Sequence, residues 1–314
     1  MLHVTTPLLP HDTLSAALGK RVLLKLESLQ PSGSFKLRGI GRLCERAVAA
    51  GARELVCPSG GNAGFAAAVA GRALGVPTTI LVPHTTPESV RRQIAAIGAR
   101  VEVHGGVWDE ANEEALRRCS SGRAAYVPPF DHPDIWDGNA TLIDEAVTQA
   151  APEGFDVVVC AVGGGGLLCG VLEGLHRNGL AQVPVIAVET EGAASLHASV
   201  KAGALVTLPA ITSIATTLGA KRVAPAAFDW TRRHEVHSVT VSDAQAVDAC
   251  LQFADDMRLL VEPACGAALA VAYQRLDVLA PYQRPLLVVC GGIAVDLEKL
   301  AAWSADRARR GPRP

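Results

Sequence analysis

The stretch Pro31-Ser32-Gly33-Ser34-Phe35-Lys36-Leu37-Arg38-Gly39 is the part of the chain from which the rest is interpreted. It follows the apolar run Val22 to Leu29, which predicts a strand, and its Pro, Ser and Gly favour a turn. Ser34 stands where a helix N-cap is expected, so Lys36 is predicted in the first turn of a helix. The helix dipole disfavours a cation there, so this lysine should lose its proton readily, as Schiff-base chemistry requires. A solvated lysine at a helix start is the alternative.

Composition limits the classes of protein to consider. The 314 residues are enough for two domains, and 49% are apolar but only 4% aromatic, as in α/β enzymes with closely packed helices. A net charge of −2 gives no electrostatic support for binding nucleic acid or a membrane surface. Eight dispersed cysteines without a C-x-x-C pair, no zinc spacing, no visible signal sequence and no bilayer-length apolar run predict a cytoplasmic protein with reduced thiols.

Strand-like and helix-like segments alternate along the chain. The alternation runs from Glu54 to Val127 and resumes from Ala140 to Ala302, with a loop-rich stretch over Leu205 to Val241. Pro128 to Gly138 has turn residues throughout and is predicted to be a loop that crosses between domains. The pattern predicts an α/β protein of two domains, each an open, mostly parallel sheet flanked by helices.

Four successive glycines, Gly163 to Gly166, separate a buried strand from a helix beginning at Leu167. Glycines let the backbone approach a phosphate, whose charge suits the N–H groups at a helix start; a tight turn is the alternative. A G-x-G-x-x-G motif fails because Leu168 or Cys169 occupies its last position, and no P-loop is present. Glu189, at the end of the next strand, nevertheless keeps a nicotinamide enzyme as a minority alternative.

Two further strand ends carry polar groups. Ser59-Gly60-Gly61-Asn62-Ala63-Gly64 ends a strand and opens a helix, so it could hold a carboxylate through N–H groups and the Ser59 hydroxyl, or could be an ordinary capped turn. Cys290 ends the last strand before Gly291-Gly292, and its thiol could donate a weak hydrogen bond to a ring nitrogen or be merely a buried structural group. Cys290 has no obvious histidine partner, so the sequence does not predict a cysteine hydrolase.

A reactive lysine, a phosphate cradle, a carboxylate cradle and a thiol at a strand end together suit pyridoxal phosphate. The chain resembles the fold-type II pyridoxal-phosphate enzymes, which have a tryptophan synthase β-like fold, and among them the catabolic L-serine/L-threonine dehydratases. The resemblance extends along nearly the whole chain. It is carried by Pro31 to Gly39, Ser59 to Gly64, Pro129-Phe130-Asp131, Gly163 to Leu168, Val261-Glu262-Pro263-Ala264-Cys265-Gly266-Ala267-Ala268 and Val289-Cys290-Gly291-Gly292.

The resemblance implies roles for individual residues. Lys36 would form the Schiff base and act as general base, with Phe35 against the cofactor ring and Asn62 at its hydroxyl. The remaining implied contacts are Ser59, Gly60, Asn62 and Ala63 with the substrate carboxylate, Gly163, Gly164, Gly165, Gly166 and Leu167 with the phosphate, Cys290 with the ring nitrogen, and Gly163, Glu189, Ala193, Leu218 and Ala220 with a monovalent cation such as K⁺. It further implies a homodimer, a large phosphate-binding domain of residues 1–30 plus 133–314, and a small domain of residues 31–132 that carries Lys36.

The implied reaction converts L-serine to pyruvate and ammonia, and L-threonine to 2-oxobutyrate. Threonine dehydratase, serine racemase and β-replacement activities on the same scaffold stay open, as do a nicotinamide oxidoreductase and a non-catalytic binding protein. The chain departs from the dehydratase pattern at Ile293-Ala294, where relatives often have Ser-Asn. That change puts the hydrogen bonding around Cys290 in doubt.

Overall fold

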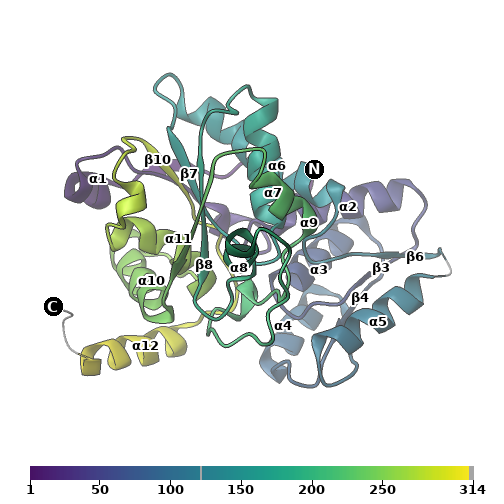
Figure 1. The fold of residues 1–314 in the computed structure, drawn as a ribbon. Helices are drawn as coiled ribbons and strands as arrows, with labels where there is room; N and C mark the ends of the chain where they lie inside the picture. The colour runs from purple at the N-terminus through teal and green to yellow at the C-terminus, as the bar shows by residue number, and fades with distance from the viewer. Residues whose placement is uncertain (121, 311–314) are drawn as a thin grey trace.

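The computed structural model describes residues 1–120 and 122–310, and it contains two separate sheets that lie side by side (Figure 1). The larger sheet has six strands, and all neighbouring strands are parallel except the antiparallel pair β1–β2. In spatial order its strands are β1 (Leu8–Pro10), β2 (Leu23–Lys25), β10 (Pro285–Val288), β7 (Val157–Ala161), β8 (Val185–Thr190) and β9 (Val236–Val241). The central strands β7 and β8 are buried along their whole length, and their residues are apolar except for Glu189 and Thr190 at the end of β8, as expected where both faces of a parallel sheet are covered.

The smaller sheet is entirely parallel, with strands in the order β5 (Arg100–Val103), β4 (Thr78–Val82), β3 (Glu54–Cys57) and β6 (Ala124–Tyr126). Successive side chains of β3 point to opposite faces, as the period of a strand requires. Leu55 and Cys57 join the apolar cluster that includes α3, whereas Val56 packs with Ala111 and Ala115 of α5. The predicted α/β class with mostly parallel sheets is therefore confirmed.

Helices cover both sheets. Those of the first half are α1 (Asp12–Leu18), η1 (a 3₁₀ turn, Glu27–Leu29), α2 (Lys36–Ala49), α3 (Asn62–Leu74), α4 (Glu88–Ile97), α5 (Trp108–Cys119) and α6 (Pro133–Ala150). The second half contains α7 (Gly166–Arg177), α8 (Ser195–Ala202), η2 (Thr216–Leu218), α9 (Pro225–Trp230), α10 (Asp243–Met257), α11 (Pro263–Tyr273), η3 (Asp277–Leu279) and α12 (Leu297–Arg310). Within residues 1–120 and 122–310, no helix has the length and apolar character needed to span a bilayer.

Several local predictions were wrong. The strand predicted over Val22 to Leu29 stops at Lys25 and continues as a 3₁₀ turn. The loop predicted over Pro128 to Gly138 contains the start of α6, because His132 accepts a hydrogen bond from the Asp134 N–H and Pro133 suits the first helical turn. The loop-rich stretch Leu205 to Val241 includes α9 and the edge strand β9, whose half-buried residues lack a strong pattern.

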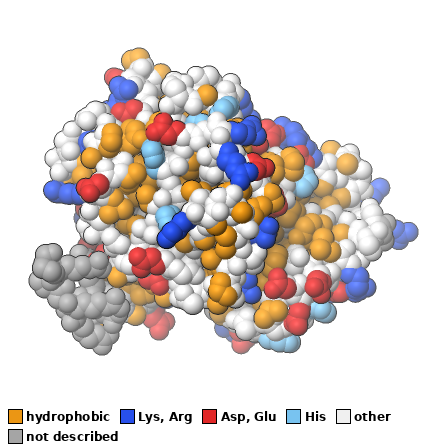
Figure 2. Space-filling view, in the orientation of Figure 1, with side chains coloured by type: hydrophobic (Ala, Val, Ile, Leu, Met, Phe, Trp, Pro, Cys, Tyr) orange, Lys and Arg blue, Asp and Glu red, His pale blue; other side chains and the backbone are white. Residues whose placement is uncertain are grey.

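Charged side chains of both signs are interspersed over the face seen in Figure 2, and no large patch of one sign dominates it. This distribution agrees with the small net charge of the chain. The face offers no extended basic surface of the kind that binds nucleic acid.

Candidate active site

A pocket, called here the main pocket, lies where the carboxyl ends of β7 and β10 approach the starts of α2, α3, α7 and α11. Ligands of open α/β sheets bind at such strand ends. Its walls come from segments far apart in the sequence: Phe35, Lys36, Asn62, Phe130, Ala161, Gly163, Gly164, Gly165, Gly166, Leu167, Thr217, Leu218, Glu262, Ala264 and Cys290. The structure therefore brings together the predicted lysine, the glycine loop, Asn62 and Cys290.

Lys36 is the first residue of α2 and so lies in the first helical turn, as predicted; its Nζ donates a 2.6 Å hydrogen bond to the Pro129 carbonyl. Nζ also lies 5.2 Å from the centre of the Phe35 ring. Burial lowers the pKa of Lys36 to about 8. A substantial fraction of the amine is then neutral near physiological pH, which both Schiff-base formation and general base catalysis need.

The predicted capping of α2 by Ser34 was wrong. The N-cap residue is Phe35, no side chain caps the helix, and the Ser34 hydroxyl is buried without a hydrogen-bond partner. The backbone of Ser34 instead forms a bridge with Gly291, and the Phe35 N–H donates to the Cys290 carbonyl at 3.1 Å. Pairing with Cys290 and Gly291, which are distant in the sequence, overrides the local capping preference.

The low pKa of Lys36 makes its reactivity depend on pH in a testable way. Competitive labelling of the cofactor-free protein with acetic anhydride should modify Lys36 about ten times faster at pH 9 than at pH 7, with little further gain, because its pKa is about 8. A short peptide with one free lysine side chain is the control, since such an amine should continue to gain reactivity towards about pH 10.4. A Lys36 profile parallel to that of the peptide would contradict the burial of the amine.

The glycine loop presents unpaired backbone donors to the main pocket. Within the described residues, the N–H groups from Gly163 to Leu168 have no backbone or side-chain acceptor. Such a row of N–H groups at the start of α7 suits a phosphate. The glycines also have a packing reason that the sequence did not reveal: an added Cβ at any of the four would lie within 3.0 Å of a neighbouring atom, and at Gly164 only 2.3 Å from the Phe130 ring.

Asn62 is held by Glu262, a residue that the sequence analysis did not assign to the site. The Asn62 Nδ2 donates to Glu262 Oε1 at 2.8 Å, and the Asn62 Oδ1 accepts from the Ile293 N–H at 3.0 Å. Both ends of the amide are thus oriented, and one hydrogen of Nδ2 remains for a ligand in the pocket. Glu262 lies in a predicted family motif, but no local pattern indicates that its side chain reaches Asn62.

Glu262 connects three segments in the wall of the pocket. It is 1% exposed, and its carboxylate also accepts hydrogen bonds from the Thr217 hydroxyl and, at 3.0 Å, from the Ala294 N–H. Burial raises the pKa of Glu262, while these donors and Lys36 oppose the shift. An added Cβ at Gly292 would lie 1.9 Å from the Glu262 Cδ, so only glycine fits there. Backbone groups of Ile293 and Ala294 make these bonds, so the departure from Ser-Asn leaves them in place.

The other predicted carboxylate contacts lie beside the main pocket rather than in its lining. Ser59, Gly60 and Ala63 belong to the turn between β3 and α3, next to Asn62. The Ser59 hydroxyl accepts a 3.3 Å hydrogen bond from the Gly61 N–H. Within the described residues, the N–H groups of residues 62 to 64 have no acceptor, so this turn has donors for an anion.

Cys290 lines the pocket at the end of β10 and is buried. A hydrogen bond with Cys265, followed by burial, raises the pKa of the Cys290 thiol well above its usual value. The thiol is therefore neutral, and it can donate only a weak hydrogen bond. All eight cysteines are free, as expected for reduced thiols.

The predicted cation ligands lie at or just after the ends of β7, β8 and η2. Glu189 is buried at the end of β8, where its carboxylate accepts backbone hydrogen bonds from Leu196 (2.9 Å) and His197 (2.6 Å) at the start of α8. Burial raises its pKa to about 7. Gly163 lies next to Leu218, since an added Cβ would be 3.3 Å from the Leu218 carbonyl oxygen. Ala193 is buried after β8, and Ala220 follows η2. No cluster of three or more His, Cys, Asp or Glu side chains suited to a metal occurs in the described residues.

Comparison with known proteins agrees with this site. Residues 1–291 match the family model described as "Pyridoxal-phosphate dependent enzyme". The chain is 48% identical to a human "Serine dehydratase-like" protein (96% of this chain, 93% of that protein) and 49% identical to a Bos taurus "L-serine dehydratase/L-threonine deaminase" (96% and 94%). It superimposes on a fungal L-serine ammonia-lyase from Rhizomucor miehei with a TM-score of 0.91 and 39% identity, covering 97% of this chain and 98% of that one. The chain therefore belongs to the family of pyridoxal-phosphate-dependent enzymes.

Proposed function

We propose that this protein is an L-serine ammonia-lyase that converts L-serine to pyruvate and ammonia and also deaminates L-threonine to 2-oxobutyrate. The observation that carries the proposal is the placement of the Lys36 amine, with its lowered pKa, in the same pocket as the unpaired N–H groups of the glycine loop. The names of the similar proteins support serine as the substrate.

The residues present fit pyridoxal phosphate. Lys36 would take its aldehyde, the N–H groups of residues 163 to 167 its phosphate, and the remaining Asn62 Nδ2 hydrogen its ring hydroxyl. Cys290 would face the ring nitrogen as a neutral thiol, with Phe35 beside the ring. When bound, the cofactor supplies an electron sink for negative charge that develops at the substrate Cα.

The chain itself supplies the base and the anchor for the substrate. The neutral amine of Lys36 accepts the Cα proton, a role for which a pKa of about 8 is well matched. The turn with Ser59, Gly60 and Ala63 holds the substrate carboxylate through its free N–H groups and the Ser59 hydroxyl. Because the pKa of the Cys290 thiol is raised, this group is a much weaker proton source than a carboxylic acid would be.

Product analysis tests the proposal. Purified protein loaded with cofactor should release pyruvate and ammonia in equal amounts from L-serine, and 2-oxobutyrate from L-threonine. D-serine formation without pyruvate would instead identify a racemase, and product formation only with an added nucleophile would identify a β-replacement enzyme. The nicotinamide alternative has no support, since the chain belongs to a pyridoxal-phosphate family and lacks the dinucleotide fingerprint.

A monovalent cation site is part of the proposal. The carboxylate of Glu189 would bind the cation together with carbonyl oxygens of Gly163, Ala193, Leu218 and Ala220. Two observations support this site: Gly163 is adjacent to Leu218, and among the described residues no cationic side chain pairs with Glu189.

We also propose the two domains given above, a cytoplasmic location and a homodimer. Separate sheets support the domains, and light scattering can test the dimer.

The cation site predicts a stability that depends on potassium. Replacing choline by K⁺ at constant ionic strength should raise the Tm by about 3 °C at pH 8. The gain should be smaller at pH 6, because the raised pKa of Glu189, about 7, means that K⁺ must displace a proton there. Glu189→Gln should lose the potassium dependence; a variant stabilised as much as the parent would exclude Glu189 as a ligand.

A further inference from the structure

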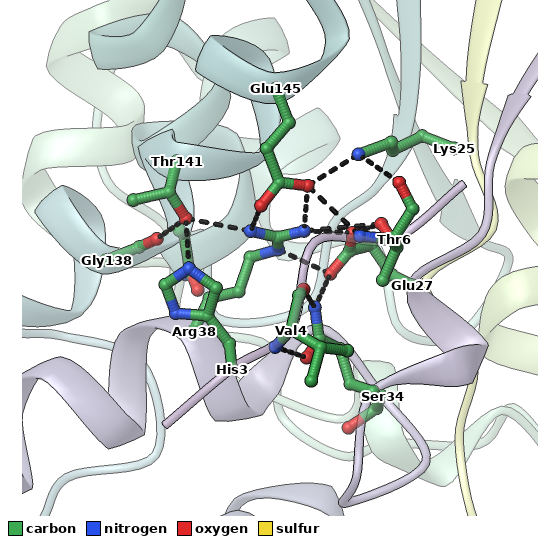
Figure 3. Close-up of polar contacts among 12 residues, drawn as sticks. His3, Val4, Thr6, Lys25, Glu27, Ser34, Arg38, Gly138, Thr141 and Glu145 are labelled. Atoms are coloured by element: carbon green, nitrogen blue, oxygen red, sulfur yellow. Dashed lines mark hydrogen bonds and ion pairs between the residues drawn. The ribbon is translucent and has the colours of Figure 1, made fainter. Parts of the chain in front are cut away.

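Arg38, two residues after Lys36, lies at the centre of a buried cluster of charges (Figure 3). The cluster contains two cations, Lys25 and Arg38, and two carboxylates, Glu27 and Glu145. The first three side chains are 0% exposed and Glu145 is 14% exposed. The charges balance, as burial of ionised groups requires. The main pocket does not include any of these residues.

The guanidinium of Arg38 donates hydrogen bonds to both carboxylates. Its Nε and Nη2 donate to the two oxygens of Glu27 at 2.6 and 2.7 Å. Its Nη1 and Nη2 donate to the two oxygens of Glu145, each at 2.7 Å. Nη1 also donates to the Thr141 hydroxyl at 2.9 Å. Two bidentate contacts of this kind fix both the position and the orientation of a planar guanidinium.

The carboxylates are themselves anchored to other parts of the fold. Glu27 accepts from the Thr6 hydroxyl at 2.6 Å, and Glu145, on α6, accepts from Lys25 Nζ at 2.6 Å. Lys25 belongs to β2 and also donates to the Thr6 carbonyl at 2.8 Å. The partners of Arg38 are therefore held by four segments: the N-terminal segment, β2, η1 and α6. We infer that the cluster is rigid.

Packing and one backbone contact also hold the first turns of α2: Leu37 and Ile40 are buried, and the Gly39 N–H donates to Asn139 Oδ1 at 3.1 Å. No side chain caps the helix, and the Ser34 hydroxyl has no partner. Backbone hydrogen bonds join Phe35 to Cys290 and Gly33 to Gly292, and they hold only residues that precede the helix. Arg38 is thus the first residue of α2 after Lys36 whose side chain is tied to the rest of the protein by ion pairs.

We propose that Arg38 is a positioning residue that sets the rotation of α2 and thereby places the Lys36 amine in the main pocket. Residues two apart on a helix project to nearly opposite sides, so a rotation that moves one moves the other equally. With side-chain ends about 6 Å from the helix axis, a rotation of roughly 10° displaces the amine by about 1 Å. A displacement of about 1 Å can lower the rate by about a hundredfold. The inference rests on the proposed function.

Arg38→Lys tests the role of the bidentate contacts with Glu27 and Glu145, because lysine preserves the charge balance but cannot make two such contacts. We expect kcat to fall at least about tenfold with KM within about threefold. In the cofactor-free variant, the midpoint of Lys36 acetylation should also move to higher pH, since a displaced amine is less buried. Phe253→Leu is the matched control: it perturbs a fully buried side chain on α10, outside the pocket, and should lower Tm without moving the acetylation midpoint.

An Arg38→Lys protein with the parent's kcat and acetylation midpoint would overturn the inference, as would losses no larger than the control shows at a comparable fall in Tm. If Arg38→Lys does not fold, Glu145→Gln is the second test, because it removes one bidentate contact at a partly exposed position. The same two measurements, kcat and the acetylation midpoint of Lys36, then test the inference. Failure of the parent protein to form a borohydride-stable adduct with pyridoxal phosphate at Lys36 would overturn the proposed function instead.

Discussion

Lys36→Ala should reduce the turnover of L-serine by at least about 10⁴-fold and should abolish covalent attachment of pyridoxal phosphate. The substitution removes the amine that lies in the main pocket with a pKa lowered to about 8 by burial. That amine has two tasks in the proposed reaction, attachment of the cofactor and removal of the Cα proton, and general base catalysis alone contributes about 10²–10⁴-fold. Pyruvate release and borohydride trapping with peptide mapping measure the two losses separately.

Lys201→Ala is the control for this experiment, because Lys201 is exposed near the end of α8 and lines neither the pocket nor the charge cluster. It should retain the activity and the adduct of the parent. The fold should survive Lys36→Ala, since the amine makes one hydrogen bond within residues 1–120 and 122–310, to the Pro129 carbonyl. A Lys36→Ala protein that still produces pyruvate, or a parent whose adduct maps to another lysine, would sink the assignment.

Glu262→Gln should lower kcat/KM by about a hundredfold and weaken cofactor binding. The carboxylate accepts hydrogen bonds from Asn62, Thr217 and the Ala294 N–H, and each such bond to a charged group contributes about 1.5–3 kcal/mol. Asn62 and Thr217 donate to Oε1 and the Ala294 N–H to Oε2, so glutamine, with one acceptor oxygen, cannot accept from both sides. An NH₂ group facing Asn62 removes its contact directly, and one facing the Ala294 N–H displaces the segment whose Ile293 N–H binds the Asn62 Oδ1. Steady-state kinetics and titration with pyridoxal phosphate check both effects.

Thr217→Val is the matched variant for Glu262. It removes one of the three donors but keeps the carboxylate and its bond to Asn62, so kcat/KM should fall by no more than about tenfold. Equal losses in the two variants would place the effect in the η2 segment rather than in the orientation of Asn62. A Glu262→Gln protein within twofold of the parent would show that the carboxylate has no part in the site.

Local sequence patterns were sufficient for the regular core of the fold. The alternation predicted from Glu54 to Val127 and from Ala140 to Ala302 is present, with β3 to β6 in the first stretch and β7, β8 and β10 in the second. These segments have strong apolar periodicity and turn residues at their ends. The edge strand β9 and the start of α6 were missed, because the first has half-buried positions and the second begins among proline and aspartate residues that also favour turns.

The sequence by itself determined the α/β class, the place of Lys36 in the first turn of a helix, the glycine loop and, through the family resemblance, the cofactor. These depend on neighbouring residues or on short motifs, which a sequence displays directly. Only the tertiary structure decided that Glu262 binds Asn62, 200 positions away. It also decided that Glu27 and Glu145 form ion pairs with Arg38. Ser34 likewise pairs with Gly291 instead of capping its helix. Such contacts arise when buried polar groups must find partners across the fold, and no local spacing records which partners they find.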